Sequence, residues 1–355
     1  MTMTAGTRVG DVPVAPIGGR PRWLGRGVRA TGLLVGLGCV ILAALASLRF
    51  GAYGVPTSAV WDALFNYDPT VYDQAVVRSQ RVPRTIIAIG IGAGLAVAGA
   101  TMQAVTRNPL ASPSILGVSA GSAFAVVTAT FFLGLTHVSQ YLWFSFFGAV
   151  VASAIVFAIG SIGNATNAPV RLTLAGVAIS AMLGSWTSAI LLISEETFDQ
   201  IRFWFAGSVV GRDLDTFWFV SPFLVVGALV CVFMGHQLNV LSMSEDAARA
   251  LGMNTGRVRL ICAGLVVLIT GAAVSVTGPI GFVGLAVPHI IRSIVGPDYR
   301  WVLPYSLLGG AIFLIGADLI GRVIMPTGEL QAGIVTGIVG APFLIVLARR
   351  RSLAN

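Results

Sequence analysis

The chain has 355 residues, of which 56% are hydrophobic and only 10% are charged. Soluble globular domains carry about 25% charged residues, so this composition excludes a water-soluble protein and also a disordered one. The formal net charge is +8, but the 22 basic residues, all arginine, are scattered between apolar runs. Without a basic patch interleaved with aromatic residues, a nucleic-acid-binding domain is excluded as well. The composition predicts an all-α bundle in a membrane.

Ten segments are long and apolar enough to be candidate membrane spans, since a spanning helix needs about 20 mostly apolar residues. The eighth is short and contains Gly284 and Pro288. A broken helix of this kind is tolerated only where neighbouring protein or a cavity satisfies its backbone groups. The predicted spans are residues 31–50, 85–106, 114–134, 141–162, 171–193, 216–236, 258–276, 281–295, 302–321 and 331–348.

The arginines orient the bundle. An even number of spans places both termini on one side, and with the termini inside, fifteen arginines lie in inner segments and seven in outer segments. Basic residues concentrate on the cytoplasmic side, so both termini are predicted to be cytoplasmic. Residues 1–30 are predicted to form a mobile cytoplasmic tail, and residues 31–350 a single ten-span domain. Signal-peptide cleavage after residues 44–46 is the alternative, although it requires an unusually long n-region.

The longest inner loop, residues 237–259, contains signals for a short helix. Ser244 can cap its start, and Glu245 and Asp246 lie in the first turn, where the helix dipole favours negative charge. Gly252 suits the left-handed residue that follows a helix end. A helix of two turns is not stable alone in water, so this one is predicted to dock into another protein. A plain surface loop is the alternative.

Two outer segments contain charges that need partners. Arg81 and Arg84 precede the second span, and Pro83 between them predicts an extended approach. These arginines could hold lipid phosphates or receive acidic residues of an external partner. In the ninth span, Asp318 and Arg322 lie four residues apart on one helix face and could pair with each other.

The second span combines small residues with one buried polar group. Glycine and alanine recur between residues 90 and 99, which predicts close approach of neighbouring helices. Gln103 lies near the inner end of this span and is expected to need an interhelical partner or a wet cavity.

No residue pattern indicates catalysis or metal binding. His137, His236 and His289 are far apart, the three cysteines lie in apolar runs, and neither a nucleophile motif nor a phosphate-binding loop is present. The chain is therefore predicted not to be an enzyme and to bind no cofactor or metal. Work driven by ATP would require a separate subunit.

Several motifs together resemble the FecCD-type permeases of ATP-binding-cassette importers for ferric siderophores, haem and vitamin B12. Similarity extends in order over about residues 31–350. It is carried by RVPR at 81–84, GAGLAVAGATMQAVTRNPLASPSILGVSAGSA at 92–123, LAGVAIS at 174–180, WFAGS at 204–208, LNVLSMSEDAARALGMNTGRVR at 238–259, TGPIGFVGLAVPHIIR at 277–292, GPDYRW at 296–301, ADLIGR at 317–322 and GIVTGIVGAPFLIVL at 333–347.

The resemblance implies a ten-span permease in the inner membrane of a bacterium. Its implied partners are two ATP-binding subunits that bind ATP and Mg, a second permease copy or a similar sister permease, an external substrate-binding protein and membrane lipid. It also implies inverted repeats of spans two to five and seven to ten. The implied ATPase-coupling residues are Ser244, Glu245, Asp246, Ala247, Ala248, Arg249, Ala250, Leu251 and Gly252.

Two further sites are implied by matching positions. Arg81, Arg84 and Arg322 match arginines that receive acidic residues of the binding protein. The inner loop between the fourth and fifth spans matches the cytoplasmic gate of the family. The implied gate residues are Asn164, Ala165, Thr166 and Asn167.

The function expected on this basis is a permease that forms the pathway for an iron chelate. The alternative is an ion-coupled secondary transporter that works without an ATPase. That alternative predicts acidic residues at mid-membrane, whereas Asp318 lies nearer the outer boundary and the other acids lie mainly in loops.

Overall fold

The computed structural model describes residues 25–135, 137–162, 168–243, 245–325 and 328–352, and within these ranges the chain is helical with no strand. Ten apolar helices follow the ten predicted spans in order. They are α1 (Arg26–Arg49), α4 (Val82–Thr106), α5 (Val118–Leu133), α6 (Val138–Ser161), α7 (Ala168–Ile193), α9 (Leu214–Phe233), α12 (Thr255–Thr277), α13 (Val283–Val295), α14 (Tyr299–Val323) and α15 (Ala332–Ser352).

Seven of these helices are long and apolar enough to cross a membrane, namely α1, α4, α6, α7, α9, α12 and α14. The helices α5, α13 and the apolar part of α15 are shorter. The seven confirm a polytopic membrane protein, and the count of ten crossings stays a prediction. The helix α1 begins at Arg26, within the last residues of the range predicted for the N-terminal tail, and the tail itself stays a prediction.

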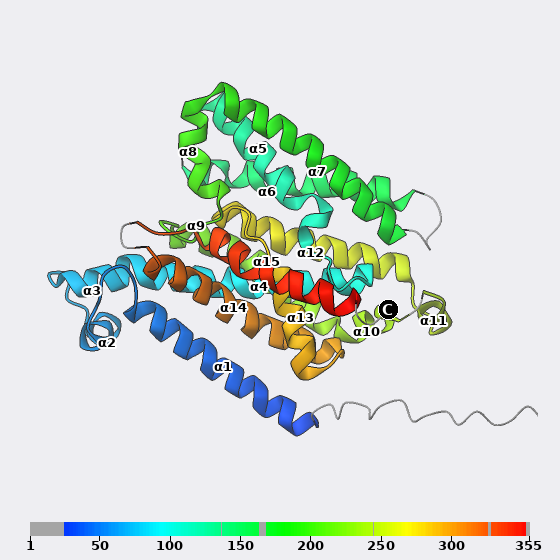
Figure 1. Ribbon diagram of the computed structural model, residues 1–355, viewed down its shortest axis with the longest axis horizontal. Coiled ribbons are helices and arrows are strands. Elements are labelled where there is room, and N and C mark those ends of the chain that lie inside the picture. The colour runs from blue at the N-terminus through cyan, green and yellow to red at the C-terminus, as the bar shows by residue number, and fades with distance from the viewer. Residues whose placement is uncertain (1–24, 136, 163–167, 244, 326–327, 353–355) are drawn as a thin grey trace, which may run out of the picture.

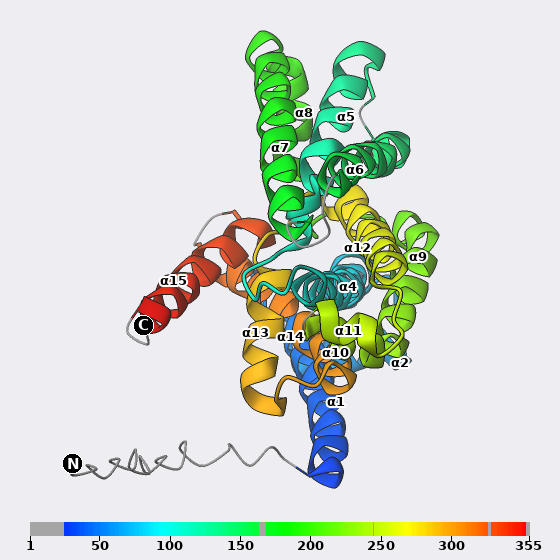
Figure 2. The same ribbon diagram turned by 90° about the vertical axis from the view of Figure 1, so that its right-hand side faces the viewer.

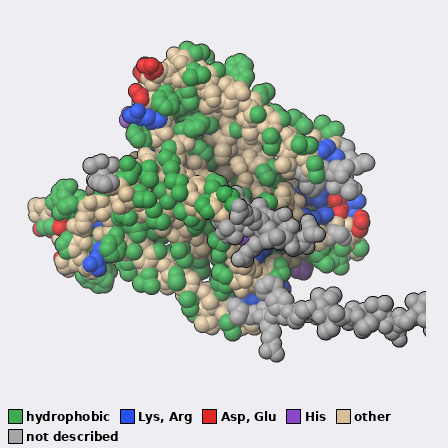
Figure 3. Space-filling view, in the orientation of Figure 1, with side chains coloured by type: hydrophobic (Ala, Val, Ile, Leu, Met, Phe, Trp, Pro, Cys, Tyr) green, Lys and Arg blue, Asp and Glu red, His purple; other side chains and the backbone are tan. Residues whose placement is uncertain are grey.

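Shorter helices lie at the two ends of the bundle (Figure 1). At one end are α2 (Thr57–Phe65), α3 (Tyr72–Val76) and α8 (Glu195–Phe205); at the other are α10 (Gly235–Ser242) and α11 (Glu245–Ala250). The first described helix begins, and the last one ends, at the same end as α11 (Figure 1). On the face shown in Figure 3, hydrophobic side chains spread over the bundle, whereas charged side chains gather towards its ends.

The helix α4 is the centre of the bundle, with α12, α13 and α14 around it (Figure 2). Its most apolar window is 78% buried, against 17% for α1 and 11% for α7. Gly92 of α4 packs against Gly310 of α14, and Gly99 packs against Gly284 of α13, so that a Cβ on any of the four would press on its partner's backbone. The predicted close approach at the small residues of the second span is confirmed.

The chain enters α4 as a continuous helix, which corrects the extended approach expected from Pro83. A π-helical turn, Val77–Arg81, joins α3 to α4, and the amide of Val82 donates to the carbonyl of Val77. Proline in a regular helix clashes with the carbonyl four residues earlier. The wider π turn at this point lets the helix continue from Tyr72 to Thr106.

The two short helices α5 and α13 start in the same way. Each begins directly after a residue with positive φ, Gly117 at 75° and Phe282 at 66°. A short 3-10 turn, Pro113–Leu116, precedes Gly117. These equivalent starts, in the third and eighth predicted spans, are what inverted repeats would produce.

Gly99→Leu is expected to destabilise the protein because the new side chain would collide with the backbone of Gly284. Overpacking of this kind costs about 1–3 kcal/mol or more. The measurement is the thermal melting temperature of the chain purified in detergent. Gly38→Leu on α1 is the control, since a Cβ there meets no atom within 4 Å; equal melting of the two variants would contradict the packing argument.

Candidate functional site

The helix α10 is fixed to the start of α14 by one asparagine. Asn239 donates from Nδ2 to Oδ1 of Asp298 over 2.6 Å and accepts the amide of Tyr299 over 2.8 Å. Burial alone would raise the pKa of Asp298, but hydrogen bonds from Arg300 and Asn239 outweigh it and lower the pKa to about 2. The carboxylate is therefore ionised at neutral pH and holds α10 and α14 together.

The predicted docking helix is present as α11, Glu245–Ala250, although it is shorter than expected. It ends as predicted, because Gly252 has φ +79° and its amide donates to the carbonyl of Arg249. Glu245 stabilises the helix through two ion pairs: its carboxylate lies 2.8 Å from Arg249 and 3.2 Å from Arg259 of α12. The expected cap Ser244 lies outside the described residues.

The docking surface consists of the exposed residues Met243, Asp246, Arg249, Ala250 and Leu251. Leu251 is 67% exposed and Met243 is 58% exposed, at an end of the bundle where charged residues are frequent. Ala248, by contrast, is fully buried against the chain itself. Exposed apolar side chains on either side of a short helix are typical of a surface that binds a protein partner.

Gln103 has the interhelical partners that its position required. Its Nε2 donates to the carbonyls of Gly284 and Leu285, over 3.4 and 3.2 Å, and its Oε1 accepts from Arg292. Pro288 has no amide hydrogen, so the carbonyl of Gly284 lacks its normal helical donor. Gln103 therefore satisfies the backbone of the broken helix α13.

A buried ion cluster lies towards the opposite end of the bundle. Asp318 of α14 is 1% exposed and pairs with Arg322 on its own helix and with Arg84 of α4 at 2.7 Å. Arg84 also contacts Glu329 at 2.6 Å, and Arg322 donates to the carbonyl of Ser47 over 2.9 Å. The pairing of Asp318 with Arg322 confirms the sequence expectation. The ion pair of Asp318 with Arg84 and the hydrogen bond from Arg322 to Ser47 were not predicted from the sequence.

Arg81, Arg84 and Arg322, which the sequence predicts to receive lipid phosphates or acidic residues of a partner, are buried and do not project outwards. All three are less than 10% exposed. Arg81 donates to the carbonyls of Leu48, Arg49 and Tyr53 and so caps the end of α1, where carbonyls have no helical donor. The three arginines hold the C-terminal ends of α1 and α14 to the N-terminal end of α4, and their part in docking stays a prediction.

The gate residues Asn164, Ala165, Thr166 and Asn167 lie outside the described residues. Among the residues that are described, no group of three or more His, Cys, Asp and Glu side chains is placed to hold a metal ion.

Asp318→Asn is expected to destabilise the chain strongly, because Arg84 and Arg322 would remain buried without a counter-charge. Removal of one partner from a buried pair costs about 3–5 kcal/mol. The measurement is the thermal melting temperature in detergent, with Asp199→Asn as the control. Asp199 and Arg202 form an exposed pair, which is expected to contribute little. A variant of Asp318 that melts like the control would show that the cluster is not structural.

Comparison with known proteins gives one consistent family. Residues 39–350 match the model of the FecCD transport family. The chain is 43% identical over 328 residues to the ferric enterobactin transport system permease protein FepD of Escherichia coli, covering 92% of this chain and 96% of FepD. It is 41% identical over 311 residues to YfiZ of Bacillus subtilis, described as a probable siderophore transport system permease, covering 88% and 93%.

The fold matches a solved structure of the same kind. An inward-facing metal-chelate type ABC transporter aligns with a TM-score of 0.79 and 28% identity, over 90% of this chain and 99% of that one.

Proposed function

The chain belongs to the FecCD transport family and is a permease subunit of an ABC importer, and from this premise we propose that it conducts a ferric siderophore across the inner membrane of a bacterium. Haem and vitamin B12 are the other cargoes that the family implies. The siderophore is favoured because YfiZ is named for siderophore transport and FepD for ferric enterobactin transport. The cargo would reach the permease from an external binding protein.

The docking surface around α11 supports the ATP-driven part of this proposal. ATP and Mg would bind to two separate ATPase subunits, and the chain itself would bind no cofactor. Residues Ser244–Gly252 would fit a cleft of the ATPase, with Leu251 and Met243 as apolar anchors. Glu245 would transmit movement from the ATPase into α12 through Arg259, because the two side chains are 3.2 Å apart.

Leu251→Asp is expected to release the ATPase subunits, since a charge would replace an apolar anchor. The measurement is the amount of ATPase that copurifies with the chain from native membranes. Leu64→Asp is the matched control, because Leu64 is an exposed leucine of α2 at the opposite end of the bundle. Ala248 is unsuitable for this test, since its burial means that a substitution would disturb the chain itself. Full ATPase recovery with Leu251→Asp would refute the docking assignment.

Docking of the external binding protein would involve Arg81, Arg84 and Arg322. These arginines surround a small cavity of about 150 Å³ at the end of the bundle opposite α11, together with Glu329. An acidic residue of the binding protein would compete with Glu329 for Arg84, because Glu329 is partly exposed and already contacts Nη1 of that arginine at 2.6 Å.

Glu329→Gln is therefore expected to strengthen docking, since it frees Arg84 from its exposed competitor while Asp318 keeps the cluster together. The measurement is the affinity of the purified importer for its binding protein at low salt, where exposed charge pairs are least screened. Glu196→Gln on α8 is the control for loss of an exposed acid. An unchanged affinity would assign the three arginines to structure alone.

Transport would proceed by alternating access in a pair of permeases, either two copies of this chain or one copy with a sister. Asn164–Asn167 would form the cytoplasmic gate. The rival, an ion-coupled transporter, needs a carboxylate that is free to bind an ion. Asp318, which lies near the end of the candidate span Tyr299–Val323, is instead paired with two arginines.

A further inference from the structure

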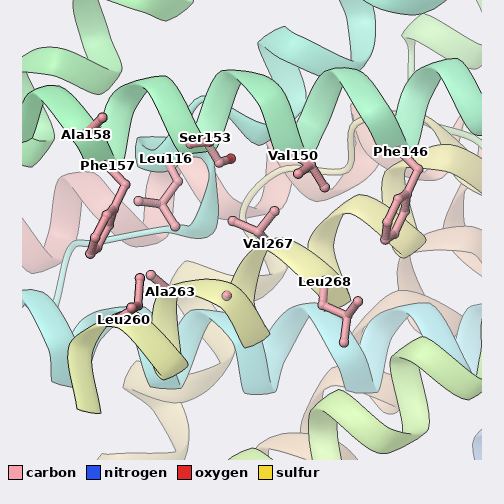
Figure 4. Close-up of a pocket in the computed structure, with 12 residues that line it drawn as sticks. Leu116, Phe146, Val150, Ser153, Phe157, Ala158, Leu260, Ala263, Val267 and Leu268 are labelled. Atoms are coloured by element: carbon pink, nitrogen blue, oxygen red, sulfur yellow. The ribbon is translucent and has the colours of Figure 1, made fainter. Parts of the chain in front are cut away.

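Two membrane-spanning helices leave an apolar groove of about 370 Å³ between them (Figure 4). Its α6 wall includes Phe146, Val150 and Phe157, and its α12 wall includes Leu260 and Leu268. Figure 4 shows Phe157 and Leu260 at one end of the groove, and Phe146 and Leu268 at the other. Residues 146 to 157 of a helix rise about 16 Å, so the groove is long and narrow.

The groove has an open side at Gly264 within the part of the chain that the structure describes. A Cβ at Gly264, in the α12 wall, would meet no atom within 4 Å. Ser153 is the only lining residue with a polar side chain, and its hydroxyl, in a residue 3% exposed, has no hydrogen-bond partner in the part of the chain that the structure describes. Both walls belong to candidate membrane spans, so the groove lies at membrane depth.

One end of the groove carries positive charge. Arg257 and Gly256 lie three and four residues before Leu260, so they continue the groove face of α12 by one turn. Arg257 is exposed, and a Cβ at Gly256 would meet only Oδ1 of Asn254, at 3.6 Å. These residues form the first turn of α12, where the helix dipole favours an anion, and the amide of Arg257 itself donates to Oδ1 of Asn254.

We propose that this groove is a binding site for one anionic phospholipid. An acyl chain lies between α6 and α12, and the phosphate of the headgroup is held by Arg257 beside Gly256. The long apolar shape, the position within candidate membrane spans and the cationic end suit such a lipid. The site also adjoins the docking helix, because Arg259, two residues after Arg257, is paired with Glu245.

Filling the groove tests the acyl-chain site. In Gly264→Phe the new ring would occupy the groove without a clash at Cβ. Native mass spectrometry of the chain purified gently from its membranes counts the phospholipids retained. We expect the variant to retain one phospholipid fewer per chain than the wild type. Gly38→Phe on α1 makes the same change at another open glycine and is expected to retain the wild-type number.

Removing the charge tests the headgroup site. Phosphatidylglycerol and phosphatidylcholine are titrated separately into the delipidated chain, and binding is followed by native mass spectrometry. One arginine near the membrane surface contributes about 1 kcal/mol towards an anionic lipid, which corresponds to about a fivefold change in affinity. Arg257→Gln is expected to lose this preference for phosphatidylglycerol, whereas Arg49→Gln, an exposed arginine at the other end of the bundle, is expected to keep it.

Two results would overturn the proposal. One is an unchanged lipid count in Gly264→Phe with a normal melting temperature. The other is separation of the paired permeases in that variant with the lipid count unchanged, which would assign the groove to a second copy. Neither result bears on transport, because ATPase recovery is measured with Leu251→Asp and reports separately on the importer assignment.

Discussion

The close contact of α4 with α13 and α14 is the constraint on which the rest of the structure depends. Where Gly92 meets Gly310 and Gly99 meets Gly284, backbones touch without intervening side chains. Without a hydrophobic driving force between helices in lipid, such contact is a main source of helix association. It places α4 in the centre of the bundle and brings polar residues at both of its ends within reach of neighbouring helices.

Each end of α4 carries a polar group that another helix needs. At its N-terminal end Arg84 shares Asp318 with Arg322. At its C-terminal end Gln103 supplies the donor that Pro288 removes from α13, and Arg107 donates to the carbonyl of Leu241 in α10 over 3.0 Å. One central helix therefore joins the buried ion cluster to the segment that precedes the docking helix. Buried polar groups are costly when unpaired, which explains why the buried Arg84 and Gln103 are paired within the chain.

Pairing within the chain also limits what Arg81, Arg84 and Arg322 can bind. A surface arginine is free to receive an acid from a partner, whereas Arg81, Arg84 and Arg322 already bind carbonyls or carboxylates of the chain. Glu329 is the partly exposed member of the cluster, so docking there would be an exchange of one carboxylate for another. The docking surface differs from this cluster, because its apolar residues Leu251 and Met243, on either side of α11, are exposed.

Composition and apolar run length by themselves determined the fold class, because the lipid environment allows few polar residues and dictates helix length. Local signals also determined the end of α11 at Gly252 and the pairing of Asp318 with Arg322, since both depend on residues a few positions apart. Tertiary structure decided which arginines are buried, the partner of Arg84 234 residues away, and the donor for the carbonyl of Gly284. It also showed that Ala248 faces inward and Pro83 sits in a continuous helix. These features depend on which helices touch, and a pattern of hydrophobicity along one chain contains no such information.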